Sequence, residues 1–467
     1  MKDIKTGKAK PIAAFALTAA LIGSSLSLTA CGESDGDVIV LRVANWEEYI
    51  DEGDWDDDEI IELADGTEIF GENSLIDDFE EWYEETYGKK VRVEYSAFGT
   101  NEAMYNQLNI GDTFDLLCPS EYMIMKLIDE DKLTPYSESF WDTSIEENYY
   151  AKYASPYIRY RLDALDIDGC CVGDYAACYM CGTLGFVYNP DVVSDEEAST
   201  WNLLLNDKYY KQVTAKDSVR DCYFAAMGIL NEDLVSSEDF RAQEDYSEQL
   251  KLVLNDTSEE TVDKIRDILT QVKDNAYSLE TDSGKADLVT GKVVANLQWS
   301  GDAVYSMDQA EEDGVYLKYA APESCTNLWF DGWVMLKDGI NDDPERRQAA
   351  EAFVNFLSYP ENAVRNMYYI GYTSAISGND EDDTVYQYID YCYGDEEADY
   401  DYDISYFFGG EDGEYVITTD EENVTRQLGA QYPSKDVINR SAIMNFFDKE
   451  ANARINRMWI DIRCFHF

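Results

Sequence analysis

The sequence predicts an α/β fold, because segments with a strand pattern alternate with segments with a helix pattern. Residues 38–44 (VIVLRVA) form a β-branched run of strand length, and residues 91–95 (VRVEY) alternate as a half-buried strand does. Between them, from Leu75, apolar residues recur at helical spacing and end at Gly88, which suits a C-terminal cap. Such alternation predicts mainly parallel sheets flanked by helices.

The same alternation divides the chain into two units. A short helix after Asn101, a strand at residues 114–118 and a further helix complete the first unit. After about residue 150, strand-like runs at residues 182–189 and 293–299 belong to a second unit. With 467 residues, of which 45% are hydrophobic, the chain is long enough for two or three packed domains.

Aromatic and hydroxyl side chains follow two strands of the first unit. Trp46 and Tyr49 come after its first strand, and Ser120 and Tyr122 come after its third. In open sheets of this kind, ligands bind beyond the carboxyl ends of the strands. We therefore expect these four side chains to line a binding site.

A single carboxylate stands among aromatic residues in the stretch NLWFDGW, residues 327–333. Asp331 follows Trp329 by two residues and precedes Trp333 by two. A carboxylate among aromatic faces suits an ammonium group, which gains charge-assisted hydrogen bonds and cation–π contact. The alternative is that the aromatic residues belong to the core and that Asp331 is a turn residue. The stretch by itself leaves both open.

The second unit offers further candidates. The motif KDSVRD, residues 216–221, places Asp217 and Asp221 near a predicted helix start, where the helix dipole favours an ionised carboxylate. Helix capping and a local ion pair explain these acids equally well. Trp299 ends a strand, as Trp46 does, and adds a second indole at a strand exit.

The charge of the chain limits its partners. The formal net charge is −60, so nucleic acid and anionic membrane surfaces would have to approach against like charge. Cationic ligands are instead attracted. Much of the acidic surface also serves solubility.

The N-terminus is typical of a secreted lipoprotein. Four lysines precede an apolar run at residues 12–22, which is too short to span a membrane, so residues 1–30 are predicted to be a signal peptide. Leu28, Ala30 and Cys31 resemble the lipobox of bacterial lipoproteins, in which the cysteine is lipidated. Residues 31–37 are then a linker to a lipid anchor on the outer face of the cytoplasmic membrane.

Nine cysteines follow Cys31, and an odd number cannot all pair within one chain. The CxxC at residues 178–181 and the adjacent pair at residues 170–171 are compatible with a zinc or redox site. With His466 as the single histidine and no second well-spaced CxxC, we expect no metal site and no cofactor. One disulfide or buried free thiols remain as alternatives.

Seven short motifs stand in the same order and at similar spacing as in one known family. From about residue 38 to residue 375, the chain resembles the spermidine/putrescine-binding proteins of polyamine ABC importers. The motifs are NWEEY (45–49), NEAMY (101–105), PSEYM (119–123), TAKDSVRD (214–221), Trp-x-Gly (299–301), WFDGW (329–333) and GYTSA (371–375).

The resemblance implies a two-lobed, type II periplasmic-binding-protein-like fold, in which each lobe is a mainly parallel sheet flanked by helices. We expect residues 38–150 and 330–375 to form the first lobe, and residues 151–329 and 376–467 the second, with a solvated Tyr- and Asp-rich insertion near residues 379–414. The resemblance also implies a monomer that closes over a polyamine and passes it to the membrane-embedded permease subunits of an importer. No catalytic residue is required.

The resemblance also assigns roles in the site. Asp331 would hold one end of the ligand and Asp221 the other, with Asp217 or Ser218 beside it. In the family, the spacing between the two acids that match Asp217 and Asp221 is shorter by one residue. The family's C-terminal glutamine has no match near Ile443. Ser120 would form a polar wall, and the aromatic walls would be Trp46, Tyr49, Tyr122, Trp299, Trp329 and Tyr372.

Two other functions are compatible with some of these features. A binding protein for another organic cation, such as a quaternary amine, would also use an aromatic cage. A secreted carbohydrate-active enzyme would show paired carboxylates and aromatic platforms, but 96 acidic residues make chance pairs inevitable. We therefore expect a binding protein rather than an enzyme.

Overall fold

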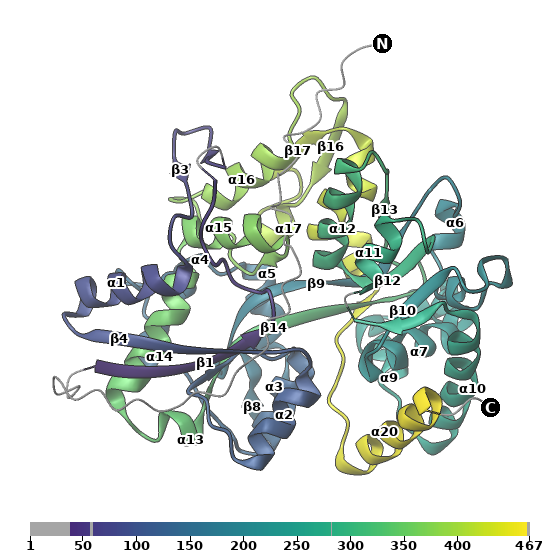
Figure 1. Cartoon of the computed structure of the whole chain (residues 1–467), viewed down its shortest axis with the longest axis horizontal. Coiled ribbons are helices and arrows are strands. Elements are labelled where there is room, and N and C mark those ends of the chain that lie inside the picture. The colour runs from purple at the N-terminus through teal and green to yellow at the C-terminus, as the bar shows by residue number, and fades with distance from the viewer. Residues whose placement is uncertain (1–37, 57–58, 282, 465–467) are drawn as a thin grey trace.

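Two long buried strands run side by side through the centre of the molecule (Figure 1). The computed structural model describes residues 38–56, 59–281 and 283–464. In it, β9 (Ala176–Tyr188) pairs antiparallel with β14 (Thr326–Leu336), and every residue of both strands is buried. Strands covered on both faces have continuous apolar runs of this kind.

On one side of this pair lies a parallel group of strands. β1 (Val38–Trp46) pairs with β4 (Lys90–Phe98) and β5 (Leu116–Leu117), and β5 joins the end of β14. The helices α1 (Leu75–Tyr87) and α14 (Pro344–Leu357) pack against β4 and β1. The predicted cap of α1 is confirmed, because Gly88 adopts the left-handed conformation with φ 68°.

On the other side lies a second parallel group. β10 (Val213–Lys216) pairs with β11 (Ser278–Glu280) and β12 (Ala295–Trp299), and β12 runs antiparallel to the second half of β9. The predicted α/β class with mainly parallel outer strands is thus confirmed. The principal helices here are α7 (Val219–Val235), α9 (Tyr246–Leu254), α10 (Glu259–Asn275), α12 (Ser300–Glu312) and α20 (Lys449–Cys464).

The remaining elements are shorter or connect the two groups. The strands are β2 (Ile61–Glu62), β3 (Glu68–Ile69), β6 (Leu133–Thr134), β7 (Asp166–Ile167), β8 (Cys170–Cys171), β13 (Lys318–Ala320), β15 (Thr373–Ser374), β16 (Tyr400–Asp403), β17 (Val416–Thr419) and β18 (Ser441–Ala442). The helices are α2 (Asn101–Ile110), α3 (Glu121–Asp129), α4 (Tyr149–Tyr153), α5 (Pro156–Asp163), α6 (Asp195–Ala198), α8 (Glu238–Arg241), α11 (Ser283–Val289), α13 (Lys337–Ile340), α15 (Pro360–Ile370), α16 (Thr384–Tyr393), α17 (Ser405–Phe408), α18 (Gln427–Gln431) and α19 (Lys435–Asn439).

The buried apolar side chains form two large cores. The first core surrounds β1, β4 and β5, includes the first half of β9 as far as Cys181, and takes in further side chains between Leu328 and Ile443. The second core surrounds β10 and β12 and begins at Leu184, so the division falls within β9. The expected boundary at residue 150 is therefore too early, because α5 and the first half of β9 pack into the first core. The predicted signal peptide, Cys31 and the linker at residues 31–37 lie outside the described residues.

The C-terminal part of the chain differs from the expectation. Residues 379–414 were expected to be a solvated insertion of the second lobe, but Val385, Tyr388 and Phe407 are buried in the first core. Tyrosine can be buried there because its ring is apolar and its hydroxyl finds a partner; the hydroxyl of Tyr402, for example, donates to the carbonyl of Tyr432 at 2.6 Å. Ala442 and the buried apolar side chains from Met444 onward join the second core.

No disulfide joins the described cysteines, and five of the nine are buried. This agrees with the buried-thiol alternative for Cys118, Cys178, Cys181, Cys222 and Cys325. Within the described residues, every helix is too short or too polar to cross a bilayer.

A buried ion pair fixes the loop that follows β1. The carboxylate of Asp51, which is fully buried, binds the guanidinium of Arg365 on α15, and the backbone N–H of Asp51 donates to Asn366 at 2.9 Å. The hydroxyl of Tyr179 on β9 donates to the carbonyl of Tyr49 at 2.7 Å. The loop is thus held to two elements that are distant in sequence.

We expect Arg365→Met to lower the free energy of unfolding by about 3 kcal/mol, because it leaves the Asp51 carboxylate buried without its cation. Urea denaturation followed by tryptophan fluorescence measures the change. The matched control is Arg266→Met on α10, where a half-exposed ion pair with Asp263 is lost and the change is expected to stay below about 1 kcal/mol. Equal effects of the two substitutions would contradict the role assigned to Arg365.

Candidate functional site

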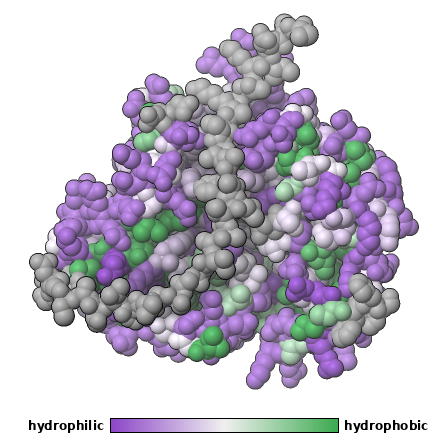
Figure 2. All heavy atoms as spheres, in the orientation of Figure 1, coloured by the Kyte–Doolittle hydropathy of each residue, from purple (hydrophilic) through white to green (hydrophobic). Residues whose placement is uncertain are grey.

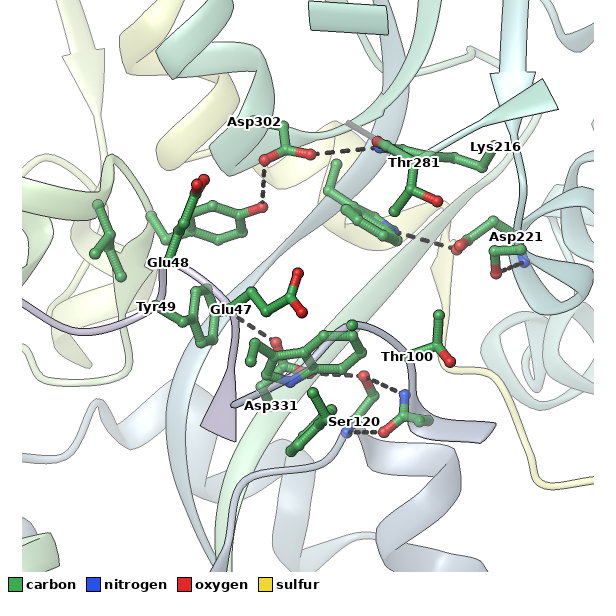
Figure 3. Close-up of a pocket in the computed structure, with 18 of the residues that line it drawn as sticks. Glu47, Glu48, Tyr49, Thr100, Ser120, Lys216, Asp221, Thr281, Asp302 and Asp331 are labelled. Atoms are coloured by element: carbon green, nitrogen blue, oxygen red, sulfur yellow. Dashed lines mark hydrogen bonds and ion pairs between the residues drawn. The ribbon is translucent and has the colours of Figure 1, made fainter. Parts of the chain in front are cut away.

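A cavity of about 1340 Å³ is lined by residues from both cores (Figure 3). It lies at the carboxyl ends of β1, β10 and β12 and against the middle of β14. This is where open α/β sheets bind ligands. Its lining includes all ten residues that the sequence indicated: Trp46, Tyr49, Ser120, Tyr122, Asp217, Asp221, Trp299, Trp329, Asp331 and Tyr372.

Asp331 is a buried carboxylate of the cavity with two hydrogen-bond donors. Its carboxylate accepts hydrogen bonds from the Tyr49 hydroxyl at 2.8 Å and from the Ser120 hydroxyl at 2.7 Å. A β-bulge between Asp331 and Gly332 interrupts the pairing of β14 with β9, and the Gly332 N–H donates instead to the carbonyl of Pro119. The bulge thus directs one carboxylate of a buried strand toward the cavity.

Burial changes the ionisation of this carboxylate. It raises the pKa of Asp331 to about 6, and the negative charge of Asp221 acts in the same direction, whereas the bonds from Ser120 and Tyr49 oppose the rise. Both donors are neutral hydroxyls. Asp331 therefore gains stabilisation from any cation that enters the cavity.

Aromatic rings surround Asp331 on the first-core side. Tyr372 packs edge-to-face on Tyr49, with ring centroids 4.9 Å apart, and lies 5.9 Å from the Trp329 ring. This packing needs Gly301 at the start of α12, because a Cβ there would lie 2.3 Å from the Tyr372 ring. Trp46 stacks on Phe98 at 5.0 Å, at the carboxyl end of β1. The expected aromatic wall is thus formed by residues from four separate segments.

Asp221 is the second buried carboxylate. It lies in the first turn of α7, is 6% exposed, and accepts a hydrogen bond from the indole N–H of Trp299 at 3.3 Å. Burial raises its pKa, and Ser218 and Lys216 oppose the rise. Asp221 and Trp299, each expected in the site, are therefore in direct contact, and the pair forms the wall on the second-core side.

The other two second-lobe candidates differ from the expectation in their contacts. The carboxylate of Asp217 forms an ion pair with Arg463 of α20 at 2.6 Å, so part of its charge is already neutralised. The hydroxyl of Ser218 caps α7 by accepting from the backbone N–H of Asp221. Tyr122 accepts from Asn101 at 2.9 Å and donates to Glu102 at 3.2 Å.

Sequence reasoning missed a charged network in the cavity. Asp302, on α12, is bound by the ammonium groups of Lys216 and Lys285, each at 3.3 Å, and by the Tyr372 hydroxyl at 2.8 Å. Burial raises the pKa of Asp302, but the charges of Lys285 and Lys216 outweigh it and lower the pKa. Both residues adjoin identified motifs: Asp302 follows Trp-x-Gly directly, and Lys216 precedes Asp217. That adjacency was the available signal.

We expect Asp331→Asn to stabilise the ligand-free protein at pH 8 by as much as about 3 kcal/mol. Because the folded-state pKa of about 6 exceeds the unfolded value, the folded state binds more protons between the two values. The stability of the parent chain therefore falls as the pH rises from 4 to above 6, and the difference between variant and parent grows over the same range. Urea denaturation at pH 4 and pH 8 measures it, with the exposed Asp263→Asn as control. If the difference in the free energy of unfolding between Asp331→Asn and the parent were the same at both pH values, the expectation would be refuted.

Comparison with known proteins identifies the family. Residues 74–390 match the model of the family described as bacterial extracellular solute-binding protein, which is more than half of the chain. The chain is 27% identical over 354 residues to the putrescine-binding periplasmic protein SpuD of Pseudomonas aeruginosa, covering 72% of this chain and 79% of that protein. It is 20% identical over 376 residues to the spermidine/putrescine-binding periplasmic protein 1 of Haemophilus influenzae, covering 77% and 84%.

Solved structures share the fold. A putative spermidine/putrescine ABC transporter protein from Listeria monocytogenes superposes with a TM-score of 0.60 at 23% identity, covering 91% of this chain and 99% of that chain. The spermidine/putrescine substrate-binding protein PotD from Streptococcus pneumoniae gives 0.57 at 23% identity, covering 91% and 98%. The expected two-lobed binding-protein fold is confirmed. From the matched model, the chain belongs to the bacterial extracellular solute-binding protein family.

Proposed function

We propose that the protein captures a polyamine, spermidine or putrescine, between its two lobes and delivers it to an ABC importer. The observation that carries the proposal is the buried Asp331 carboxylate, which is held by two neutral hydroxyls and bordered by aromatic rings. An ammonium group completes its hydrogen bonding and offsets the cost of burial. Asp221 beside Trp299 supplies a second carboxylate for the other end of the ligand.

The rest of the cavity suits the chain between the ammonium groups. A polyamine is a flexible chain of methylenes, and burying each one contributes about 0.8 kcal/mol. The rings of Trp46, Trp329 and Tyr372 line the cavity and provide that apolar surface. Closure of two lobes offsets the entropy lost when the flexible ligand is ordered.

The surface charge favours the same ligand class. With a formal net charge of −60, the chain attracts a cation from a distance and speeds its arrival. Figure 2 shows hydrophilic side chains over most of the visible face, with apolar residues in small separate groups. The two relatives from Pseudomonas aeruginosa and Haemophilus influenzae are named as putrescine- and spermidine/putrescine-binding proteins, which supports the proposal.

The proposal includes the setting in which the protein works. A monomer, anchored by lipid on Cys31 to the outer face of the cytoplasmic membrane, would present the ligand to permease subunits. No catalytic residue, metal or cofactor is needed for this function. Nucleic acid is not a partner, because the protein and the nucleic acid are both anionic and repel each other.

We expect isothermal titration calorimetry to detect binding of putrescine or spermidine by the parent protein. Asp331→Asn should weaken it at least about 30-fold, since truncating one partner of a buried charge pair costs about 2 kcal/mol or more. Trp299→Ala should also abolish tight binding, because it removes an aromatic wall and the hydrogen bond to Asp221. The exposed Asp263→Asn serves as the control that leaves affinity unchanged.

The same titrations separate the alternatives. A response to choline-like compounds alone would replace the proposal with a quaternary-amine binder, whose cage needs no hydrogen-bond donor on the ligand. Hydrolysis of a glycan would support a carbohydrate-active enzyme. Unchanged polyamine affinity in Asp331→Asn would refute the site.

The lipid anchor has its own test. In cells grown with radiolabelled palmitate, the parent protein should carry label and sediment with membranes. Cys31→Ser should lose the label and be released from the membrane, because it removes the acylated thiol. The exposed Cys464→Ser is the matched control and should remain labelled. A labelled Cys31→Ser protein would contradict the anchor.

A further inference from the structure

Three buried aspartates line the cavity, and they differ in their partners. Asp221, Asp302 and Asp331 are each 6% exposed. The hydrogen bonds to Asp331 come from two hydroxyls and the one to Asp221 from an indole, all neutral groups. Asp302 instead receives two ammonium groups from the chain itself. One of the three anionic positions is therefore already occupied by protein cations.

Lys216 occupies that position in the way a ligand would. It is the last residue of β10 and is fully buried. Its ammonium group lies 4.0 Å from the centroid of the Trp299 ring, 3.3 Å from Asp302 and 2.9 Å from the carbonyl of Thr281. An aromatic face, a carboxylate and a carbonyl are the contacts by which proteins bind a ligand ammonium.

The ammonium of Lys216 also limits what else can bind there. A second cation at the Trp299 face would meet a like charge at close range in a buried place, where screening by solvent is weak. In Figure 3, Lys216 and Asp302 lie on the opposite side of the cavity from Asp331 and Ser120. Of the three buried aspartates, Asp331 and Asp221 remain for a ligand, since their hydrogen bonds come from neutral groups.

We propose that Lys216 is a specificity-determining residue: its ammonium fills a third cation position, so that the cavity selects a diamine such as putrescine over a triamine such as spermidine. This inference rests on the proposed polyamine-binding function. The expected ligand then carries two ammonium groups, one of which binds Asp331 and the other Asp221. The central secondary amine of spermidine would bring a third charge into a cavity whose third buried aspartate, Asp302, is already paired with two lysines.

Calorimetry with putrescine and spermidine tests the proposal on the parent protein and on Lys216→Met. The parent is expected to bind putrescine at least about tenfold more tightly than spermidine. Lys216→Met removes one of the two ammonium groups on Asp302 and uncovers the Trp299 face, so the affinity ratio should shift toward spermidine by about tenfold or more. Lys216→Gln, which keeps a donor for the Thr281 carbonyl, is a second variant and should shift the ratio in the same direction.

Lys285→Met is the matched comparison. Lys285 binds the other oxygen of Asp302 but its ammonium lies over Tyr305, at 5.2 Å, rather than over Trp299. Its removal takes away the same charge and should strengthen binding of both amines, with the ratio changing less than about threefold. If the affinity ratio shifts in Lys216→Met but not in Lys285→Met, the position of the ammonium over Trp299, and not only its charge, determines the selectivity.

The outcomes are distinguishable. A parent protein that prefers spermidine, a ratio unchanged in both Lys216 variants, or equal shifts in Lys216→Met and Lys285→Met would overturn the role of Lys216 while leaving polyamine binding intact. A parent protein that binds neither amine would refute the proposed function itself. If both Lys216 variants fail to fold, as judged by thermal unfolding, the parent's ratio decides the matter.

Discussion

The carboxylate of Asp331 lies in the middle of a strand that crosses the molecule, and a charge buried there is costly unless it is hydrogen-bonded. Its two donors come from distant segments: Tyr49 follows β1, and Ser120 precedes α3. Both hydroxyls must therefore lie within hydrogen-bond distance of the Asp331 carboxylate. The position of the β1 loop is in turn secured by Asp51 on Arg365 and by Tyr179 on the Tyr49 carbonyl. The buried charge therefore requires a rigid surrounding structure.

The cavity combines carboxylates that are neutralised with carboxylates that are not. Asp302, with two lysines, contributes to the structure of the empty protein, and its pKa is lowered. The pKa values of Asp331 and Asp221 are raised, mainly because they are buried. Perturbed groups of this kind are typical of functional sites, where stability is given up for binding. The difference between these three acids indicates where a cation is expected and where one is already present.

The two cores are each assembled from separate stretches of chain. β9 contributes to both, β14 contributes to the first, and the end of the chain returns first to one core and then to the other. As a result, the cavity is lined by residues as far apart as Trp46 and Arg463. The link between α20 and the site is direct, since Arg463 pairs with Asp217.

The sequence by itself determined the α/β class, the cap at Gly88 and the ten residues that line the cavity, because strand and helix periodicities and short motifs are local properties. It misjudged the Tyr- and Asp-rich segment, since acidic composition suggests solvent while the rings of Tyr388 and Tyr402 are buried in the first core. It also missed the pairing of Lys216 with Asp302, which are 86 residues apart. Only the tertiary structure decides which carboxylates receive a protein cation, because that depends on distances between segments that are remote in sequence.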